Sequence, residues 1–261
     1  MAIDTATEMR ASELDLKLHA GSMVYVLPCI AGHVGADAAG VVLAEAPQNL
    51  EDISLLIDVG TNAEIVLGNK DRLLAASSPT GPAFEGAQIS AGQRAAPGAI
   101  ERLRIDPETL EPRYSVIGSD IWSDREGFEE AVKNTGITGI CGSGIIETLG
   151  EMYLTGIITA EGVIDGSLAS RTDRIQQDGR TFKYQITDTV SVLQNDVRAI
   201  QLAKAALHAG FRLLMDKMAL SKVDRVILAG AFGSYIDPKY AMILGMVPDC
   251  PLDKVIAAGN S

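Results

Sequence analysis

The sequence predicts an α/β protein with a mixed sheet flanked by helices, and three observations support that prediction. Of the 261 residues, 47% are hydrophobic but only 5% are aromatic, a balance typical of α/β enzymes rich in small aliphatic side chains. The apolar stretches Ile53–Asp58 and Arg225–Ala229 predict buried strands. Between them, apolar residues recur at near-helical spacing from Gln194 to about Ala219, which predicts the longest helix.

The N-terminal half predicts a strand, a helix and an antiparallel meander. Met23–Ile30 is apolar and β-branched, as strands are, and small residues from Ala36 onward favour a helix. The strand Ile53–Asp58 is followed by a tight turn and by an antiparallel partner at Glu64–Leu67, with a third strand at Arg72–Ala76. We therefore expect three neighbouring strands joined by short turns.

Glycine punctuates the middle of the chain. Residues 81–86 predict a phosphate-side loop that leads into a short helix, and the polar residues 100–134 predict irregular structure. A strong helical pattern then opens at residues 142–144.

The last third alternates between short elements and turns. Residues 162–187 alternate in polarity around an Asp178-Gly179 turn, which predicts a hairpin. A glycine turn is expected over residues 230–234, followed by a short helix from Pro238 to Leu244, with proline at an early helical position.

The formal net charge of −12 argues against nucleic acid or an anionic membrane as a partner, because the summed field repels polyanions. A small anion can still bind where backbone N–H groups converge. Apolar runs stop well short of a membrane span, and the first 20 residues lack the apolar region of a secretory signal. Cys29, Cys141 and Cys250 are far apart, which fits a reducing compartment and gives no site for an iron–sulfur cluster. We predict a cytoplasmic protein that binds neither nucleic acid nor membrane.

The sharpest local signal is a turn between two apolar strands, Asp58-Val59-Gly60-Thr61-Asn62. A carboxylate at a strand end can hold hydrated Mg²⁺, Gly60 permits close backbone approach, and the two polar residues offer donors to a phosphate. An ordinary hairpin turn explains the pentapeptide equally well, because Asp, Gly and Asn favour turns. The candidate phosphate-binding residues are Asp58, Gly60, Thr61 and Asn62, and Asp58 is the candidate Mg²⁺ residue, acting through water.

A second candidate phosphate site precedes a helix, where free N–H groups favour an anion. Its residues are Gly142, Ser143 and Gly144. Close packing of the helix on a sheet explains the glycines equally well. The run matches neither a P-loop nor the dinucleotide-binding fingerprint.

A third glycine turn follows a strand and precedes a helix, so its backbone is open to a nucleoside. The candidate nucleoside-binding residues are Gly230, Ala231, Phe232 and Gly233. Any strand-to-helix turn can use glycine, but the order of the three turns, phosphate with metal, phosphate, then nucleoside, favours a nucleotide site.

Five motifs in this order resemble one family. They are LPCIAGHVGAD at 27–37, LIDVGTN at 56–62, GPAFEGA at 81–87, GICGSG at 139–144 and LAGAFG at 228–233. From about Leu27 to the C-terminus, the chain is similar to the ASKHA portion, an actin-like ATPase fold, of the reductive activators of corrinoid proteins. Those proteins use ATP to drive an electron from a [2Fe–2S] cluster onto the cobalt(II) of a corrinoid partner.

The resemblance implies an actin-like, RNase H-related sheet that forms one side of an ATP cleft. Residues 58–62 would be the second phosphate-binding loop, residues 142–144 would lie along the phosphates or the lobe connection, and residues 230–233 would form the adenosine turn. ATP and Mg²⁺ are the implied ligands, and a corrinoid protein or a corrinoid-dependent methyltransferase is the implied partner. A homodimer is a further expectation.

The family's cluster-binding cysteines and its earlier Asp-x-Gly-Thr loop have no counterpart here, and the family continues beyond an ending such as residues 259–261. We therefore expect a fragment of a longer protein, with residues 1–22 as an N-terminal extension or added segment. Residues 23–261 are then the ASKHA-type nucleotide-binding domain. The [2Fe–2S] cluster is expected only in a preceding domain, and the isolated chain is expected not to hydrolyse ATP.

Two other functions stay open. A small-molecule kinase of the same superfamily needs a catalytic carboxylate, for which Asp37 and Glu85 are the candidates. A non-catalytic binding or dimerisation module needs only that the glycine turns serve packing.

Overall fold

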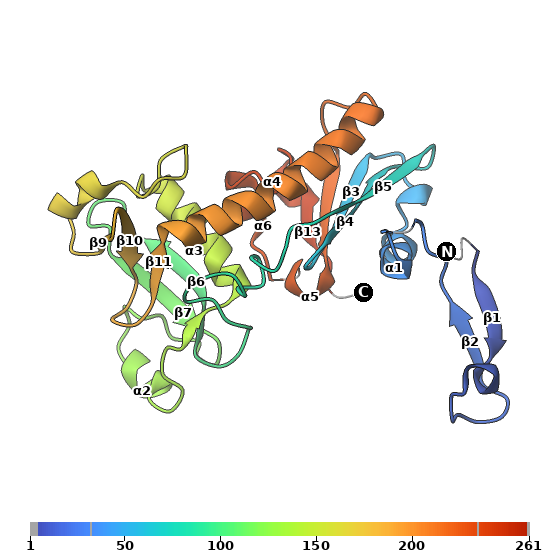
Figure 1. Cartoon of the computed structure of the whole chain (residues 1–261), viewed down its shortest axis with the longest axis horizontal. Helices are drawn as coiled ribbons and strands as arrows, with labels where there is room; N and C mark the ends of the chain where they lie inside the picture. Colours follow the sequence, from blue (N-terminus) through green and yellow to red (C-terminus); the bar gives the residue numbers. More distant parts are fainter. Residues whose placement is uncertain (1–4, 32, 234, 260–261) are drawn as a thin grey trace.

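The computed structural model describes residues 5–31, 33–233 and 235–259, and it is an elongated molecule with two lobes along one long helix (Figure 1). That helix is α4, Gln194–Lys217, which confirms the predicted longest helix. Gly32, Ser234, Asn260 and Ser261, which belong to predicted motifs and turns, lie outside the described residues.

The larger lobe contains a five-stranded mixed sheet with the strand order β13-β12-β3-β4-β5. The strands are β3 Ser54–Val59, β4 Ala63–Gly68, β5 Leu73–Ser78, β12 Arg225–Ala229 and β13 Val255–Ala257. β3, β4 and β5 form the predicted antiparallel meander, while β12 pairs in parallel with both β3 and β13. The carboxyl ends of β3 and β12 therefore lie side by side.

The two faces of this sheet pack on different helices. Leu55 and Ile57 of β3 belong to the main core, which also contains Phe211 of α4. Leu56 belongs to a smaller cluster with Val41 of α1, Ala36–Glu45. Because side chains alternate along a strand, Asp58 lies on the same face as Leu56, the face that α1 covers.

The smaller lobe contains two three-stranded sheets, with the orders β7-β6-β8 and β11-β10-β9. The strands are β6 Ala99–Ile105, β7 Pro112–Val116, β8 Gly139–Ile140, β9 Ile175–Asp178, β10 Thr181–Gln185 and β11 Ser191–Leu193. Its helices are α2 Phe128–Val132 and α3 Gly142–Leu154. The hairpin predicted around Asp178-Gly179 is confirmed as the β9–β10 pair.

The prediction that residues 100–134 are irregular was wrong, because this segment holds most of β6, all of β7 and α2. Arg102 and Arg104 hid the strand pattern of β6. Both arginines form ion pairs with a fully buried glutamate, Glu147 of α3, so their charge does not mark a solvent-exposed loop.

The chain also contains several short helical elements. They are α5 Gly230–Gly233 and α6 Pro238–Ile243, with 3-10 turns at Ala11–Leu14, Pro47–Asn49, Gly166–Ser170 and Leu252–Lys254. The structure therefore places a short helix where a glycine turn was expected after β12. It places consecutive turns, not a helix, after residues 81–86, where Gly81 and Gly86 both have positive φ angles.

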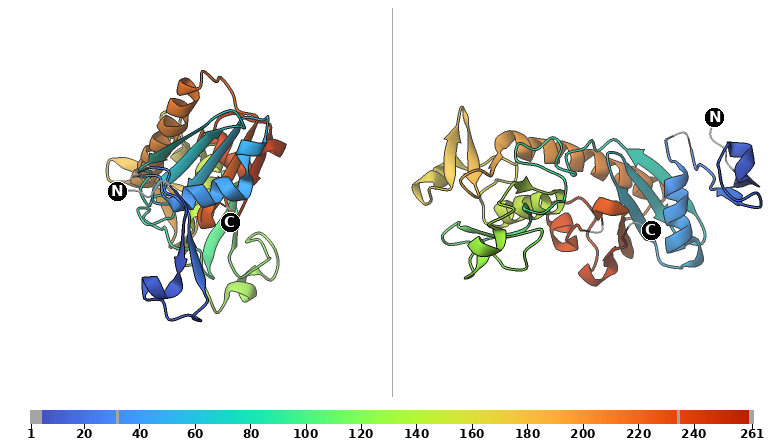
Figure 2. Two further views of the ribbon diagram at one scale, coloured as in Figure 1. Left: turned by 90° about the vertical axis from the view of Figure 1, so that its right-hand side faces the viewer. Right: turned by 90° about the horizontal axis from the view of Figure 1, so that it is seen from below.

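An antiparallel hairpin stands at one end of the molecule, beyond α1 (Figure 2). Its strands are β1 Thr7–Arg10 and β2 Met23–Val26, so the strand predicted at Met23–Ile30 is shorter than expected. None of the helices in the described part of the chain combines the length and the apolar character that a bilayer crossing requires.

Candidate nucleotide-phosphate site

The turn between β3 and β4 is tight and well supported. The Gly60 N–H donates to the Asn62 carbonyl at 3.1 Å. Thr61 and Asn62 are both exposed, whereas the flanking residues Val59 and Ala63 are buried. The polar residues of the predicted phosphate loop therefore face solvent at the end of two buried strands.

Thr80, which the sequence did not single out, and the predicted phosphate-side loop that follows it hold this turn in place. The buried Thr80 hydroxyl contacts the carbonyls of Gly60 and Thr61 at 3.0 and 3.1 Å, and the Gly81 N–H donates to Thr61 at 2.9 Å. The Thr61 hydroxyl donates to Glu85 at 3.1 Å. Glu85, a candidate acid for the kinase alternative, thus contacts the phosphate-loop candidate directly.

The β12–α5 corner lies against Asp58. Ala229 of β12 is paired in register with Asp58 of β3, and Gly230 follows it with φ +85°. A Cβ atom at Gly230 would lie 2.3 Å from Asp58 Oδ1 and 3.3 Å from the Val59 carbonyl. Only glycine allows both this left-handed backbone and this close approach to the carboxylate.

Three carboxylates gather on the face that α1 covers. Burial and then the nearby Asp37 carboxylate raise the pKa of Asp58 above its ordinary value. Glu64 lies opposite Asp58 in the β3–β4 register. Its pKa is also raised, mainly by burial and further by Asp37 and Asp58, against a hydrogen bond from Ser77 that lowers it. The site therefore has an excess of negative charge that a cation would relieve.

A cavity of about 510 Å³ opens onto this face. It lies between the hairpin, α1 and the ends of β3 and β12, and it is lined by Tyr25, Val26, Leu27, Ala36, Asp37, Gly40, Val41, Asp58 and Gly230. Of the predicted site residues, Asp58 and Gly230 line it. Asp37, which the sequence offered only for a kinase, lines it as well.

The β8–α3 corner has a different environment. A Cβ at Gly142 would lie 2.2 Å from both the Phe232 ring and the Phe84 carbonyl oxygen, and one at Gly144 would lie 2.3 Å from the Ile100 carbonyl oxygen. The buried Ser143 hydroxyl contacts Cys141 Sγ at 3.3 Å. Protein atoms therefore fill the space beside all three candidate phosphate residues of this corner.

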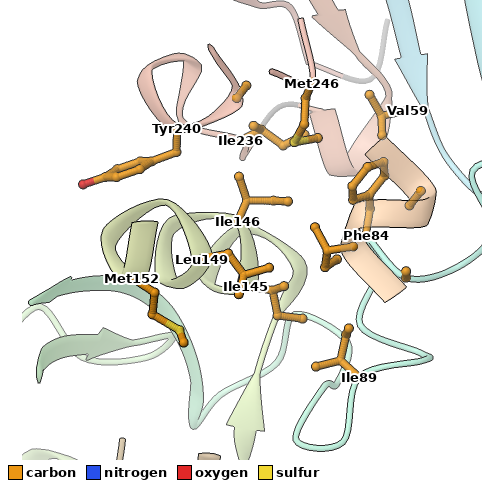
Figure 3. Packing of buried hydrophobic residues seen from close by; sticks show 14 of the residues in the cluster. Val59, Phe84, Ile89, Ile145, Ile146, Leu149, Met152, Ile236, Tyr240 and Met246 are labelled. Carbon is orange, nitrogen blue, oxygen red and sulfur yellow. The ribbon is translucent and has the colours of Figure 1, made fainter. Parts of the chain in front are cut away.

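Phe232 joins the two glycine corners. Its ring stacks on Phe84 with the centroids 6.4 Å apart, and it covers Gly142. Gly233 is buried against β12, and Ala231 lies in the same helix, α5. Around this contact, Phe84, Ile145 and Ile146 pack in the main core with Ile236 and Met246 (Figure 3).

Two buried glutamates hold α3 against β6 and α6, and the sequence did not reveal them. Glu147 accepts from Arg102 Nη1 at 2.5 Å, from the Leu103 N–H at 3.2 Å, and from Arg104. Glu151 accepts from the Ile105 N–H at 2.9 Å and from the Tyr240 hydroxyl. Their i, i+4 spacing on an otherwise apolar helix was the available signal, because such carboxylates need partners when buried.

The three predicted turns thus meet, but not all in one cavity. Asp58 and Gly230 lie together on the cavity, Thr61 and Asn62 are exposed beside them, and Gly142 lies beneath Phe232. The roles given to these residues in binding phosphate, nucleoside and metal stay predictions.

Comparison with known families identifies the fold. Residues 52–261 match the model of the C-terminal domain of RACo, the ASKHA domain, and residues 1–49 match the RACo middle region. The chain belongs to the RACo family. Its ASKHA fold is the actin-like mixed α/β fold that the motifs predicted. The two RACo matches meet near residue 50, whereas the boundary predicted at residues 22–23 stays a prediction.

Similar RACo relatives have names that refer to corrinoid proteins. The chain is 33% identical over 270 residues to the corrinoid activation enzyme RamQ of Eubacterium limosum, covering 98% of this chain and 42% of that protein. It is 29% identical over 241 residues to the [Co(II) methylated amine-specific corrinoid protein] reductase of Methanosarcina barkeri, covering 91% of this chain and 42% of that protein. The chain therefore spans less than half the length of these relatives.

A solved structure agrees with the family assignment. The reductive activator for corrinoid, iron-sulfur protein superposes with a TM-score of 0.79 at 33% identity, over 97% of this chain and 39% of that chain. This RACo-family match covers both lobes and the N-terminal hairpin region.

Proposed function

We propose that this chain binds ATP with Mg²⁺ at the corner where β3 and β12 end, and that it serves an ATP-dependent reductive activator of a corrinoid protein. The observation that supports the ligand is the contact between Asp58 and Gly230 on the 510 Å³ cavity. In open α/β sheets, ligands bind beyond the carboxyl ends of the strands, where this corner lies.

The residues present fit a hydrated Mg²⁺ ion. Among the described residues, no group of three or more His, Cys, Asp or Glu side chains has the arrangement of a complete metal site. Mg²⁺ does not need one, because it keeps several waters and binds through one or two carboxylates and the substrate phosphates. A cation beside Asp58 would offset the burial and the neighbouring Asp37 charge that raise the pKa of this carboxylate.

Each part of the corner has a distinct proposed task. Asp58 orients the hydrated cation, and the exposed Thr61 and Asn62 donate to phosphate oxygens. Gly230 lets the backbone of α5 approach the ligand without a side chain. The buried Thr80 fixes the turn through two carbonyls and so holds these donors in one geometry.

We assign the β8–α3 corner a mechanical task in place of a direct phosphate contact. Phe232 of α5 touches Gly142 of α3, and α3 is joined to β6 through Glu147. A shift of α5 on nucleotide binding would therefore move α3 and the small sheet together. Lobe movement of this kind is how nucleotide-binding folds gate the docking of a partner.

The names of the relatives support the wider role. In the proposed scheme, a [2Fe–2S] cluster outside this chain supplies one electron, and the corrinoid cobalt(II) accepts it to become cobalt(I). This sequence holds only three cysteines, whereas such a cluster takes four protein ligands, usually all cysteine. Cys29, Cys141 and Cys250 are free thiols, which fits the proposed cytoplasmic location.

The role is tested with the longer protein that contains this chain. Cobalt(I) formation is followed by absorbance with a reductant and a corrinoid protein, with and without MgATP. We expect ATP to raise the rate at least about tenfold, and Asp58→Asn to remove that stimulation. Equal rates with and without ATP would contradict the proposal.

A further inference from the structure

A second cavity lies between α3, α4 and α6, far along the chain from the Asp58 corner. Its volume is about 150 Å³, and its walls include Leu149, Ile158, Val197, Ile200 and Ile243. Engineered apolar cavities of about 150 Å³ take up benzene. This cavity therefore has room for an apolar body of about six carbon atoms.

One positively charged side chain, that of Lys204, lines this cavity. Lys204 of α4 is the only charged residue among its lining residues in the part of the chain that the structure describes. It is half-buried and forms no ion pair with any described residue. Its Nζ lies 3.5 Å from the position that a Cβ would take at Gly245, directly after α6. Lys204 Nζ is not among the buried side-chain nitrogens that lack a partner, so it stays open to solvent and to an anion that enters the cavity. An anion there would meet its positive charge.

Two of the other polar lining side chains are already engaged. The Gln201 amide donates to the Glu161 carbonyl at 3.2 Å and accepts from Arg198 at 2.6 Å. The Thr159 hydroxyl accepts from the Val163 N–H at 3.3 Å. The cavity thus offers one positive group, Lys204, next to Tyr153 and to a set of apolar side chains.

We propose that this cavity binds a small monocarboxylate with a compact apolar body, such as an aromatic or branched aliphatic acid. The carboxylate lies beside Lys204, and the apolar body contacts Leu149, Val197 and Ile200. Shape selects a ring-sized body, and charge selects an anion over a neutral or cationic molecule of the same shape. The site is separate from the proposed nucleotide site and does not depend on it.

Benzoate is the probe for a direct test, with benzyl alcohol and benzylammonium as ligands of similar shape and different charge. Titration calorimetry on the full chain, without nucleotide, is expected to show one benzoate per chain, with each of the other two at least about tenfold weaker. Isoleucine methyl NMR is expected to show shifts at Ile158, Ile200 and Ile243. Equal binding of benzylammonium, or shifts elsewhere, would overturn the proposal, as would the absence of benzoate binding at millimolar concentration.

Two variants separate charge from shape. Lys204→Met is expected to weaken benzoate at least about tenfold and to leave benzyl alcohol unchanged, and Lys217→Met on the same helix is the matched control. Ala160→Leu fills the cavity from the segment that follows α3 and is expected to weaken both ligands. Benzoate binding that resists both Lys204→Met and Ala160→Leu would place the ligand elsewhere and overturn the proposal.

Discussion

At the β12–α5 corner, the space that a Cβ would take at Gly230 is filled by the Asp58 carboxylate, whereas at the β8–α3 corner the space at Gly142 is filled by the Phe232 ring and the Phe84 carbonyl. The first corner lines a cavity and has a raised carboxylate pKa beside it. The second is buried in the main core. A glycine before a helix thus has a ligand-facing or a packing role according to its neighbours.

The largest effect is expected where α3 is held by buried charge. Glu147→Ala removes the acceptor of two arginines and of the Leu103 N–H. Breaking a buried pair from one side costs about 3 kcal/mol or more. In a chain of this size that loss corresponds to a fall in melting temperature of about 6–12 °C. Calorimetric melting measures it.

Glu130→Ala is the control for that change, because Glu130 forms an exposed pair with Lys133 at 3.1 Å. Exposed pairs contribute at most about 1 kcal/mol. An equal fall in melting temperature in Glu147→Ala and Glu130→Ala would contradict a structural role for Glu147.

Gly142→Ala is expected to destabilise the fold next most strongly. Its Cβ would meet a ring atom and a backbone oxygen at 2.2 Å, and the backbone oxygen cannot rotate away. Overpacking of this kind costs about 1–3 kcal/mol. Affinity for MgATP, measured on the folded fraction, should change less than about threefold, since protein atoms already occupy this corner.

Gly21→Ala is the matched control in urea titrations of Gly142→Ala, because a Cβ at Gly21 meets only ordinary contacts with His19. If Gly142→Ala kept normal stability but lost affinity for MgATP, the β8–α3 corner would have to contact the phosphates. That result would contradict the difference proposed between the two glycine corners.

Gly230→Ala is expected to have a smaller effect on stability and a larger one on the ligand. The positive φ of +85° costs about 1–2 kcal/mol for alanine. The new methyl group also displaces the Asp58 carboxylate, so MgATP affinity should fall at least about tenfold.

Gly179→Ala is the control for Gly230→Ala, because it introduces the same kind of backbone strain without a new contact to Asp58. Gly179 has φ +58°, and no atom of the described residues lies within 4 Å of the position that its Cβ would take. Thermal melts should show a lower melting temperature in both variants, because both carry the backbone strain. MgATP titrations should show a lower affinity in Gly230→Ala alone. Unchanged MgATP affinity in Gly230→Ala would contradict the proposed site.

The smallest effect on stability is expected from Asp58→Asn, and its sign is positive. Because the pKa of Asp58 is raised in the folded state, the folded protein holds its proton to higher pH than the unfolded chain does. Wild-type stability therefore falls as pH rises from the unfolded pKa through the folded pKa. Without Mg²⁺, Asp58→Asn should melt higher than wild type at pH 7, and the gap should close toward pH 4.

Asp106→Asn is the control of opposite sign. Hydrogen bonds from Thr109 and from the Glu108 N–H lower the pKa of Asp106, so its carboxylate stabilises the fold above the unfolded pKa and this contribution is lost as pH falls. A Tm for Asp58→Asn below that of wild type at pH 7 would show that Asp58 is a stabilising residue in the absence of ligand.

Strand and helix periodicity predicted the sheet and its turns. The apolar stretch Ile53–Asp58 and the glycine after Ala229 were sufficient to place Asp58 and Gly230 at strand ends, although the sequence could not show that these strands are neighbours. Parallel pairing between residues about 170 positions apart leaves no local signal. Only the resemblance of the five motifs to a known family indicated that the two strands belong to one sheet.

The sequence could not separate the two kinds of glycine corner. Phe232 and Phe84 are apolar residues with no pattern that marks them as partners of Gly142. The arginines of β6 made a strand look like a loop, since their buried partner Glu147 lies about 45 residues further on. Asp37 of α1 lies near Asp58 because side chains alternate along β3, which places the Asp58 side chain on the face that α1 covers. The sequence did not show this arrangement.

The central claim is that Asp58, beside Gly230, is the cation-binding residue of an ATP site. Titration calorimetry of ATP into wild type and Asp58→Asn, with Mg²⁺ and with EDTA, tests it most directly. We predict Mg²⁺-dependent binding to wild type and at least about tenfold weaker binding to Asp58→Asn. The same affinity in both proteins, or affinity that EDTA leaves unchanged, would contradict the claim.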